Sequence, residues 1–179
     1  MDDLVVQAMA KWPNVPDCYG WLGLDARGDW YMRDDQTQAA GPFASSKGSK
    51  LQHQKLIEFI GRNYEVDKDG CWYFQNGPQR VCVELTHTPW VWRIQPNGTV
   101  QSHTGKEVVV QQALTDEQGL VYLQTNLGLG LVHTQDVALA ATEIEQGHWP
   151  LMEIAQAELP SRYGFIQSPQ REISTKKPA

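Results

Sequence analysis

An eight-residue pattern that occurs three times constrains the fold of this chain more than any other feature. The copies are residues 25–32 (DARGDWYM), residues 67–74 (DKDGCWYF) and, in a degenerate form, residues 116–123 (DEQGLVYL). Asp-x-x-Gly is typical of a tight hairpin turn, because Asp bonds to its own backbone and Gly supplies a positive φ. The aromatic and apolar residues that follow favour a strand. Each copy therefore predicts a turn that leads into a strand.

A fourth turn and the residues around all of the turns predict an antiparallel meander. Asn97 and Gly98 lie within the segment QPNGTV, which has the Asn-Gly signature of a hairpin. Apolar residues precede three of the four turns, as in paired strands. They are Trp21, Leu22, Leu24, Val91, Trp92, Ile94, Val108, Val109, Val110 and Leu114.

Two segments have helical rather than strand spacing. Residues 49–63 place Leu51, Leu56, Phe59 and Ile60 on one face, with Ser49 and Gln52 as a capping box. Residues 134–147 begin at Thr134 as N-cap and end at Gly147. The order hairpin then helix thus occurs near 20–62 and again near 108–146, which indicates an internal duplication. Independent use of the same turn chemistry is the alternative.

The expected fold class is α+β and rich in β structure. We expect two related halves, each of antiparallel hairpins plus one helix, with a barrel-like second half. Residues 1–18 form an N-terminal segment with a short helix, residues 19–88 the first half and residues 89–166 the second. Residues 34–48 are expected to be a loop. Residues 167–179 are polar and contain two prolines, so we expect a disordered tail.

Charge and composition exclude several classes of protein. The 179 residues carry a net charge of −6 and no dense Lys/Arg run, so nucleic acid is not an expected partner. No segment approaches the ~20 apolar residues of a membrane helix, and the acidic N-terminal residues are unlike a signal peptide. The three cysteines have no C-x-x-C spacing. We expect a reduced, cytoplasmic protein without a membrane partner.

The sequence contains no catalytic or metal-binding motif. The five histidines show no metal-ligand spacing, and neither a nucleophile elbow nor a dinucleotide fingerprint occurs, so we expect no catalytic residue, no metal and no cofactor.

In residues 80–86, alternation predicts a core face of Val81, Val83 and Leu85. Cys82, Glu84 and Thr86 lie on the other face, which is either partly exposed or covered by a second layer.

Two groups of residues are candidates for binding a ligand. Trp90 and Trp92 lie on one predicted strand face, and Arg80 and Arg93 flank them. Two indoles with an arginine form either a stacking surface for a planar ligand or an apolar seam between the halves. Thr125 and Asn126 precede two glycines and a helix, an arrangement that suits an anion. The alternative there is a glycine-containing β-bulge that packs on the helix.

The chain resembles an uncharacterised proteobacterial family of unknown function. The likeness covers residues 11–166 and rests on residues 11–35 (KWPNVPDCYGWLGLDARGDWYMRDD), 60–92 (IGRNYEVDKDGCWYFQNGPQRVCVELTHTPWVW) and 123–140 (LQTNLGLGLVHTQDVALA). More distantly, the layout resembles a second family of unknown function. That resemblance implies a duplicated α+β core, a pleckstrin-homology-like C-terminal half, and a cleft between the halves for a nucleotide-like ligand in signalling.

Three functions remain open at this point. The first is a non-enzymatic module that binds a small, nucleotide-like ligand between the halves. The second is an interaction or scaffold protein, for example a homodimer with an exposed β edge. The third is a hydrolase or transferase assembled from scattered Asp, Glu and His residues, without a recognisable motif.

Overall fold

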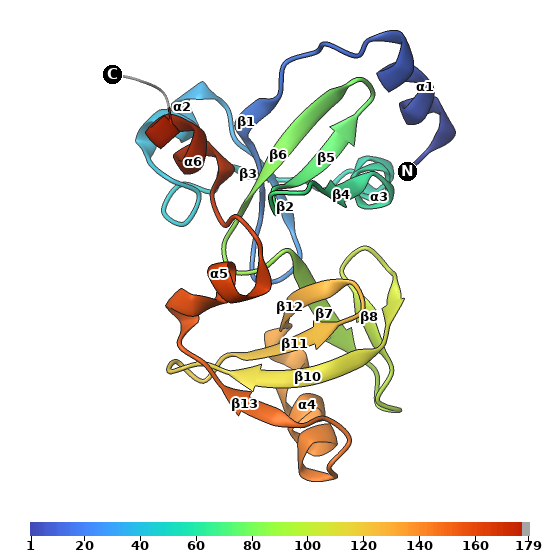
Figure 1. Cartoon of the computed structure of the whole chain (residues 1–179), viewed down its shortest axis with the longest axis vertical. Helices are drawn as coiled ribbons and strands as arrows, with labels where there is room; N and C mark the ends of the chain where they lie inside the picture. Colours follow the sequence, from blue (N-terminus) through green and yellow to red (C-terminus); the bar gives the residue numbers. More distant parts are fainter. Residues whose placement is uncertain (177–179) are drawn as a thin grey trace. The chain divides into compact units, whose positions relative to one another are not determined.

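Strand pairing divides the chain into two units, each with its own sheet. This is the arrangement in the computed structural model, which describes residues 1–176 (Figure 1). Unit 1 comprises residues 1–25, 29–86 and the segment from residue 165 onward, and unit 2 comprises residues 26–28 and 87–164. The main division lies next to the boundary expected at residues 88–89. The return of the chain to unit 1 after residue 164 was not expected.

Unit 1 contains a mixed sheet with helices. Its helices are α1 (Asp3–Lys11), α2 (Asp35–Ala40), α3 (Gln54–Arg62) and α6 (Pro169–Lys176). Its strands are β1 (Cys18–Leu24), β2 (Trp30–Met32), β3 (Ser49–Lys50), β4 (Tyr64–Val66), β5 (Trp72–Asn76) and β6 (Gln79–Leu85).

Unit 2 contains a second mixed sheet, which curves into a half-barrel (Figure 1). Its strands are β7 (Trp90–Ile94), β8 (Val100–Ser102), β9 (Glu107–Val108), β10 (Val110–Thr115), β11 (Val121–Thr125), β12 (Gly128–Val132) and β13 (Leu151–Glu153). Its helical segments are the 3₁₀ turns η1 (Thr134–Asp136) and η2 (Gln156–Glu158) and the helices α4 (Val137–Glu145) and α5 (Leu159–Tyr163).

The two sheets have the same strand topology. The order in unit 1 is β3-β2-β1-β6-β5-β4, and the order in unit 2 is β9-β8-β7-β12-β11-β10, with β13 added beyond β10. In each sheet the first long strand pairs in parallel with the last strand of a three-strand meander, β1 with β6 and β7 with β12. The expected α+β class and two related halves are therefore confirmed. The pleckstrin-homology-like character of unit 2 stays a prediction.

The predicted hairpin turns are present and share one geometry. The turns connect β1 to β2, β4 to β5, β7 to β8 and β10 to β11. In each, the first turn residue donates its backbone N–H to the carbonyl four residues later, at 2.8–3.2 Å. The fourth turn residue is Gly28, Gly70, Gly98 or Gly119, with φ between 80° and 86°. Because a side chain strongly disfavours this left-handed conformation, the glycine of the repeated phrase is required by the turn.

One face of the unit 1 sheet forms an aromatic core. Tyr64 lies edge-on to Trp30 at 5.1 Å between ring centroids and tilted against Trp72 at 5.0 Å. Helix α3 covers this face, because Phe59 packs edge-on against Phe74 of β5 at 5.5 Å. Val81, Val83 and Leu85 are buried as expected.

The opposite face of the unit 1 sheet is covered by a second layer, one of the two expected arrangements. Cys82 is fully buried and Glu84 is 2% exposed. The C-terminal helix α6 supplies part of the cover, since Ser168 and the backbone N–H of Gln170 both donate to the Glu84 carboxylate. The expected disorder is therefore wrong for residues 167–176, because this buried carboxylate satisfies the first donors of the helix and Gln167 bonds to Leu85 and Thr86. The same expectation for residues 177–179 lies outside the described residues.

Three other local expectations need correction. Helix α3 begins after His53, whose Nδ1 accepts from the Leu56 N–H at 3.4 Å, and not at Ser49. Ser49 and Lys50 pair instead with β2 as a short edge strand. The expected loop at 34–48 contains α2, which Asp34 caps by accepting from the Thr37 N–H. The expected second helix starts with a 3₁₀ turn, and α4 ends at Glu145, just before Gly147.

Candidate functional site

The residues expected to form one ligand site fall in both units. Arg80 belongs to unit 1, whereas Trp90, Trp92, Arg93, Thr125 and Asn126 belong to unit 2. The common site expected for them therefore stays a prediction. Each group can be described within its own unit.

The two tryptophans are packed in unit 2. Their rings stack with centroids 5.9 Å apart and an interplanar angle of 17°, and Trp90 and Trp92 are only 3% and 0% exposed. The Trp90 indole N–H donates to the carbonyl of Leu127, and that of Trp92 donates to the carbonyl of Leu123, both at 3.0 Å. With both polar groups bonded and both faces buried, this geometry favours a packing role over ligand stacking.

One glycine of β12, Gly130, is explained by these indoles. A Cβ at Gly130 would overlap the indole of Trp92 and approach the Cβ of Trp90 at 2.8 Å. The strand can pass beneath the tryptophans only because this position carries no side chain. Packing therefore accounts for Gly130 without an anion.

Arg93, Thr125 and Asn126 make structural contacts. The guanidinium of Arg93 pairs with the Asp136 carboxylate at 2.7 Å, which joins β7 to the start of α4. Thr125 donates to the carbonyl of Gly128, and its hydroxyl accepts from the N–H of Leu127. Asn126 accepts from the N–H of Val109 at 2.9 Å. These contacts hold β11, β12 and their turn in place.

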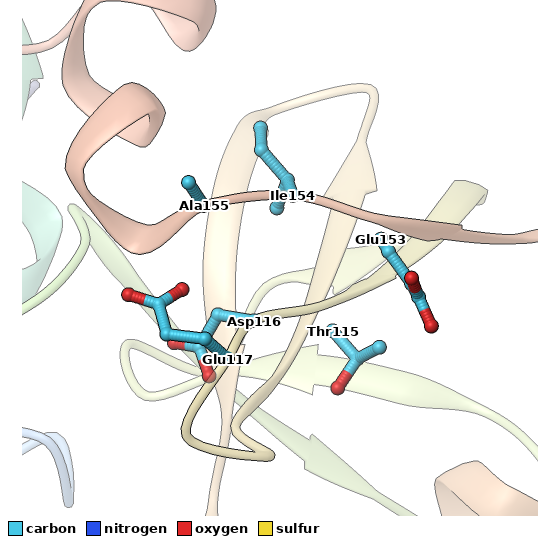
Figure 2. A pocket seen from close by; sticks show the side chains of 6 residues that line it. All are labelled: Thr115, Asp116, Glu117, Glu153, Ile154 and Ala155. Carbon is cyan, nitrogen blue, oxygen red and sulfur yellow. The ribbon is translucent and has the colours of Figure 1, made fainter.

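An open recess of about 540 Å³ lies on unit 2 beside the β10–β11 turn. On one side are the end of β10 and the start of the turn, and on the other is the segment that follows β13 (Figure 2). Its lining residues are Thr115, Asp116, Glu117, Glu153, Ile154 and Ala155. No pattern in the sequence indicates this recess, because residues 115–117 and 153–155 approach each other only through the parallel pairing of β10 with β13.

The carboxylates of the recess differ in how far they are already bonded. Asp116 is 7% exposed and accepts from the N–H groups of Gln118 and Leu120, the hydroxyl of Tyr122 and the amide of Gln156. Glu117 accepts from the backbone N–H of Gln156 at 2.8 Å through one oxygen. The Glu153 side chain lines the recess, is exposed, and extends away from the carboxylates of Asp116 and Glu117 (Figure 2). Glu117 and Glu153 therefore have oxygens available to a ligand.

The charge of the recess determines which ligands suit it. Its charged lining residues are all acidic, and the chain as a whole carries −6. Such a field attracts cations and repels phosphate. Ile154 and Ala155 add an apolar wall that suits the carbon chain of an organic cation.

A second group of polar residues lies on the α6-covered face of unit 1. Arg80, Cys82 and Glu84 alternate along β6 and so share this face. Arg80 pairs with Asp17 at 2.9 Å and with Asp67 at 2.8 Å, and its guanidinium lies 4.9 Å from the Tyr73 ring centroid. Burial opposes the charge of Arg80, but the hydrogen bond to Asp67 and the surrounding negative groups raise its pKa, so it remains a cation.

The thiols of this face lie next to each other. The Sγ atoms of Cys71 and Cys82 are 3.5 Å apart, and the side chains are buried. The hydrogen bond with Cys82 lowers the pKa of the Cys71 thiol, burial opposes this effect, and the charge of Arg80 adds to it. The hydrogen bond with Cys71 and burial both raise the pKa of Cys82. Alternation along β6 predicts Cys82 on this face, but no pattern in the sequence indicates that Cys71 lies next to it.

Within residues 1–176, no group of three or more His, Cys, Asp or Glu side chains is arranged to hold a metal ion. Over the same residues, no helix combines the length and apolar character needed to cross a membrane.

Fold and site together define an α+β protein of two topologically repeated units, with an acidic recess on the second. Residues 1–170 match the family DUF2944, described as "Protein of unknown function (DUF2946)", and the chain belongs to this family. No curated protein matches the chain. A solved structure of a DUF1285 family protein from Silicibacter pomeroyi DSS-3 is similar, with 14% identity and a TM-score of 0.49 over 78% of this chain and 83% of that one. The expected membership of an uncharacterised family, distantly similar to a second one, is confirmed.

Proposed function

We propose that this protein is a non-enzymatic binding module for a small organic cation, an amine or guanidinium compound, held in the acidic recess of unit 2. The observation that carries the proposal is the recess itself, with the available carboxylate oxygens of Glu117 and Glu153 on opposite sides. Its volume of about 540 Å³ lies within the range of small-molecule sites. We also propose that the protein acts in signalling and is located in the cytoplasm, as expected from the sequence.

The charge of the recess favours a cation over the nucleotide-like ligand expected from the sequence. A phosphate group would approach Asp116, Glu117 and Glu153 without a cationic lining residue to offset the repulsion. An ammonium or guanidinium group instead donates to carboxylate oxygens in charge-assisted hydrogen bonds. Binding of a nucleotide-like ligand is thus the competing outcome of the binding test.

Thermal-shift and calorimetric titration with spermidine, agmatine and arginine test the proposal, with NaCl at matched ionic strength as the baseline. A ligand that binds only the folded state raises the free energy of unfolding by mass action, by about 2.7 kcal/mol at 100 times its dissociation constant. The melting temperature rises with it. We expect at least one of the three cations to do so and ATP to have no effect. Stabilisation by ATP alone would contradict the proposal.

Matched variants locate the binding. Glu153→Gln removes one charge from the recess, and Glu107→Gln removes one charge from β9, at the opposite edge of the same sheet. We expect the first to weaken cation binding about tenfold, since losing one charge-assisted contact costs on the order of 1.4 kcal/mol. The Glu107→Gln control should bind as the wild type does. Equal weakening by both variants would indicate a diffuse charge effect and no recess site.

A homodimer is a second candidate function, favoured by the exposed apolar side chains of the N-terminal segment. Val5 of α1 is buried, whereas Leu4, Val6 and Trp12 expose 79%, 50% and 56% of their surface. A second copy that packs against this segment with its own would bury these side chains by two-fold symmetry. Size-exclusion chromatography with light scattering should then give twice the monomer mass, and Leu4→Glu should restore the monomer. A wild-type monomer at high concentration would contradict this candidate.

A further inference from the structure

The Cys71–Cys82 pair is a feature that the proposed binding function does not use. Cys71 follows the β4–β5 turn directly, and Cys82 lies in β6 beside β5. Their sulfur atoms are 3.5 Å apart, although the residues are 11 positions apart in the sequence. Two thiols held this close in one folded unit are poised for a reaction that joins them.

Comparison of the two units shows that the fold does not require these thiols. Tyr73 pairs with Cys82 across β5 and β6, and Tyr122 pairs with Leu131 across β11 and β12. In the matching turns, Cys71 corresponds to Leu120. The positions of both cysteines are thus occupied by leucines in unit 2.

Arg80 is a further departure of unit 1 from its repeat. In the first and third copies of the phrase, the turn aspartate accepts from a tyrosine hydroxyl six residues later, Asp25 from Tyr31 and Asp116 from Tyr122. In the second copy, Asp67 accepts from Arg80 at 2.8 Å. The copy that contains a cysteine is therefore the one whose anchor aspartate holds a cation beside the thiols.

We propose that Cys71 and Cys82 form a peroxide-sensitive dithiol site, in which a small hydroperoxide oxidises Cys71 and Cys82 then closes a disulfide. The Cys71 thiolate attacks one oxygen of hydrogen peroxide, the O–O bond breaks, and the products are Cys71 sulfenic acid and hydroxide, which takes up a proton to give water. The Cys82 sulfur then displaces the sulfenic hydroxyl, which leaves with the Cys82 proton as a second water. Overall, the two thiols lose two electrons and two protons, and the peroxide is reduced to two waters.

The geometry accommodates this bond. The sulfur atoms must approach from 3.5 Å to about 2.05 Å. Cys71 lies outside the register of β5 with β6, and its backbone N–H and carbonyl bond instead to Asp67 across the turn. Cys71 can therefore shift toward Cys82 without breaking the ladder between the two strands.

Burial and charge determine the oxidant and the order of events. Cys71 is 6% exposed and Cys82 is not exposed at all, so a small peroxide suits the site better than a bulky disulfide reagent. Arg80 favours the thiolate of Cys71, which is the form that attacks peroxide. Cys71 is therefore the attacking residue and Cys82 the resolving one, with Arg80 as a positioning residue.

The full-length protein is treated with hydrogen peroxide, quenched, alkylated after unfolding and analysed by intact mass and peptide mapping. We expect a species that has lost two hydrogen atoms and carries a Cys71–Cys82 cross-link, which dithiothreitol reverses. Cys18→Ser is the matched control and should react as the wild type does. Burial raises the pKa of the Cys18 thiol, so this cysteine should remain reduced under the same conditions.

Trapping the intermediate tests the order of the steps. In Cys82→Ala the disulfide cannot form, and a dimedone adduct on Cys71 should accumulate. In Cys71→Ala no adduct should form on Cys82. Two unmodified thiols at peroxide concentrations that already oxidise Cys18 would overturn the proposal, and so would a cross-link through Cys18.

The role of Arg80 is tested by the pH profile of the reaction. Arg80→Gln should slow the oxidation about threefold or more at neutral pH and shift the profile to higher pH, because Asp17 and Asp67 remain near Cys71 without their cation. Arg80→Lys keeps the charge and should largely restore the rate. An unchanged pH profile in Arg80→Gln would show that Arg80 does not affect the reactivity of Cys71. The disulfide itself is tested separately, by the mass analysis.

Discussion

The hydroxyl of Tyr122 donates a 2.7 Å hydrogen bond to the carboxylate of Asp116, six residues earlier in the chain. Tyr31 makes the same bond to Asp25 at 3.2 Å in unit 1. In its first and third copies the repeated phrase thus encodes more than a turn, because the aspartate binds backbone N–H groups of the turn with one oxygen and the strand tyrosine with the other. Both ends of the phrase are tied together by one carboxylate.

Tyr122→Phe should destabilise the protein more than Tyr31→Phe. Tyr122 is fully buried, so removing its hydroxyl deprives a buried carboxylate of a donor, at a cost of about 1–3 kcal/mol. Tyr31 is only half-buried and water can replace its hydroxyl, so about 0.5–1 kcal/mol is expected. Urea unfolding of the two variants measures both values. A larger loss for Tyr31→Phe would show that burial does not govern this bond.

Gly130→Ala should destabilise unit 2 through the Trp92 indole. A Cβ at this position overlaps the indole, and overpacking of a core typically costs about 1–3 kcal/mol. Trp92→Phe should make the alanine more tolerable, because the smaller ring lacks the atoms that overlap. A double-mutant cycle by chemical denaturation measures this coupling. If the free-energy changes of the two substitutions were additive, the added methyl group would be accommodated without contact with the Trp92 indole.

Trp92→Ala should be among the most damaging single changes in unit 2. The side chain is fully buried and its N–H is bonded to Leu123, so a loss of about 3–5 kcal/mol is expected, out of the roughly 5–15 kcal/mol typical of a domain. Thermal and urea unfolding measure it. An unchanged melting temperature would contradict the packing role and make Trp92 a candidate ligand-binding residue again.

The pH dependence of stability should reveal the buried Glu84. Burial raises the pKa of this carboxyl above its ordinary 4.5, while bonds from Ser168 and Gln170 and the charge of Arg33 oppose the rise. The folded state thus keeps the proton to a higher pH than the unfolded chain does. The stability contribution is complete below pH 4.5 and is lost as the pH rises through the folded-state pKa.

Glu84→Gln isolates that contribution, because an amide can still accept from the Gln170 N–H and donate to Ser168. The free energy of unfolding of the wild type minus that of the variant should fall as the pH rises from about 4 and then level off. Urea titrations across this range provide the measurement. A difference that grows with pH would show that the carboxylate is instead favoured in the charged form.

Arg93→Gln should have the opposite pH signature. Burial opposes ionisation of Asp136, but bonds from Arg93 and the Ile94 N–H hold its pKa below 3.8. The contribution of this carboxylate is therefore present above pH 3.8 and lost as the pH falls through the folded-state pKa. Because Arg93 is 45% exposed, we expect a loss on the order of 0.5–1 kcal/mol at neutral pH that shrinks in acid. Acid unfolding curves of the two proteins make the comparison.

The features of the fold that the sequence predicted correctly are those set by residues close together in the chain. Turns set by Asp, Asn and Gly were confirmed, and alternation in β6 correctly separated Val83 from Cys82 and Glu84. The duplication was inferred from the repeated phrase, but the feature that repeats is the strand order, while α3 and α4 occur at different points in the two units.

What the sequence did not reveal depends on contacts between distant segments. Residues 169–176 are too polar to indicate a packed helix, and only the buried carboxylate of Glu84, 84 positions before Ser168, makes their ordering understandable. The Cys71–Cys82 contact and the recess between residues 115–117 and 153–155 are of the same kind. Propensity and periodicity describe neighbours along the chain and carry no information about such pairs.

The return of residues 165–176 to unit 1 has a consequence for synthesis on the ribosome. The carboxylate of Glu84 is made early, but its donors on Ser168 and Gln170 emerge only after the whole of residues 87–164 has been translated. Domains fold as units from the N-terminus while the chain is being made. Until then, the part of the sheet face of unit 1 that α6 covers stays uncovered, and unit 2 can complete its own sheet before unit 1 is closed.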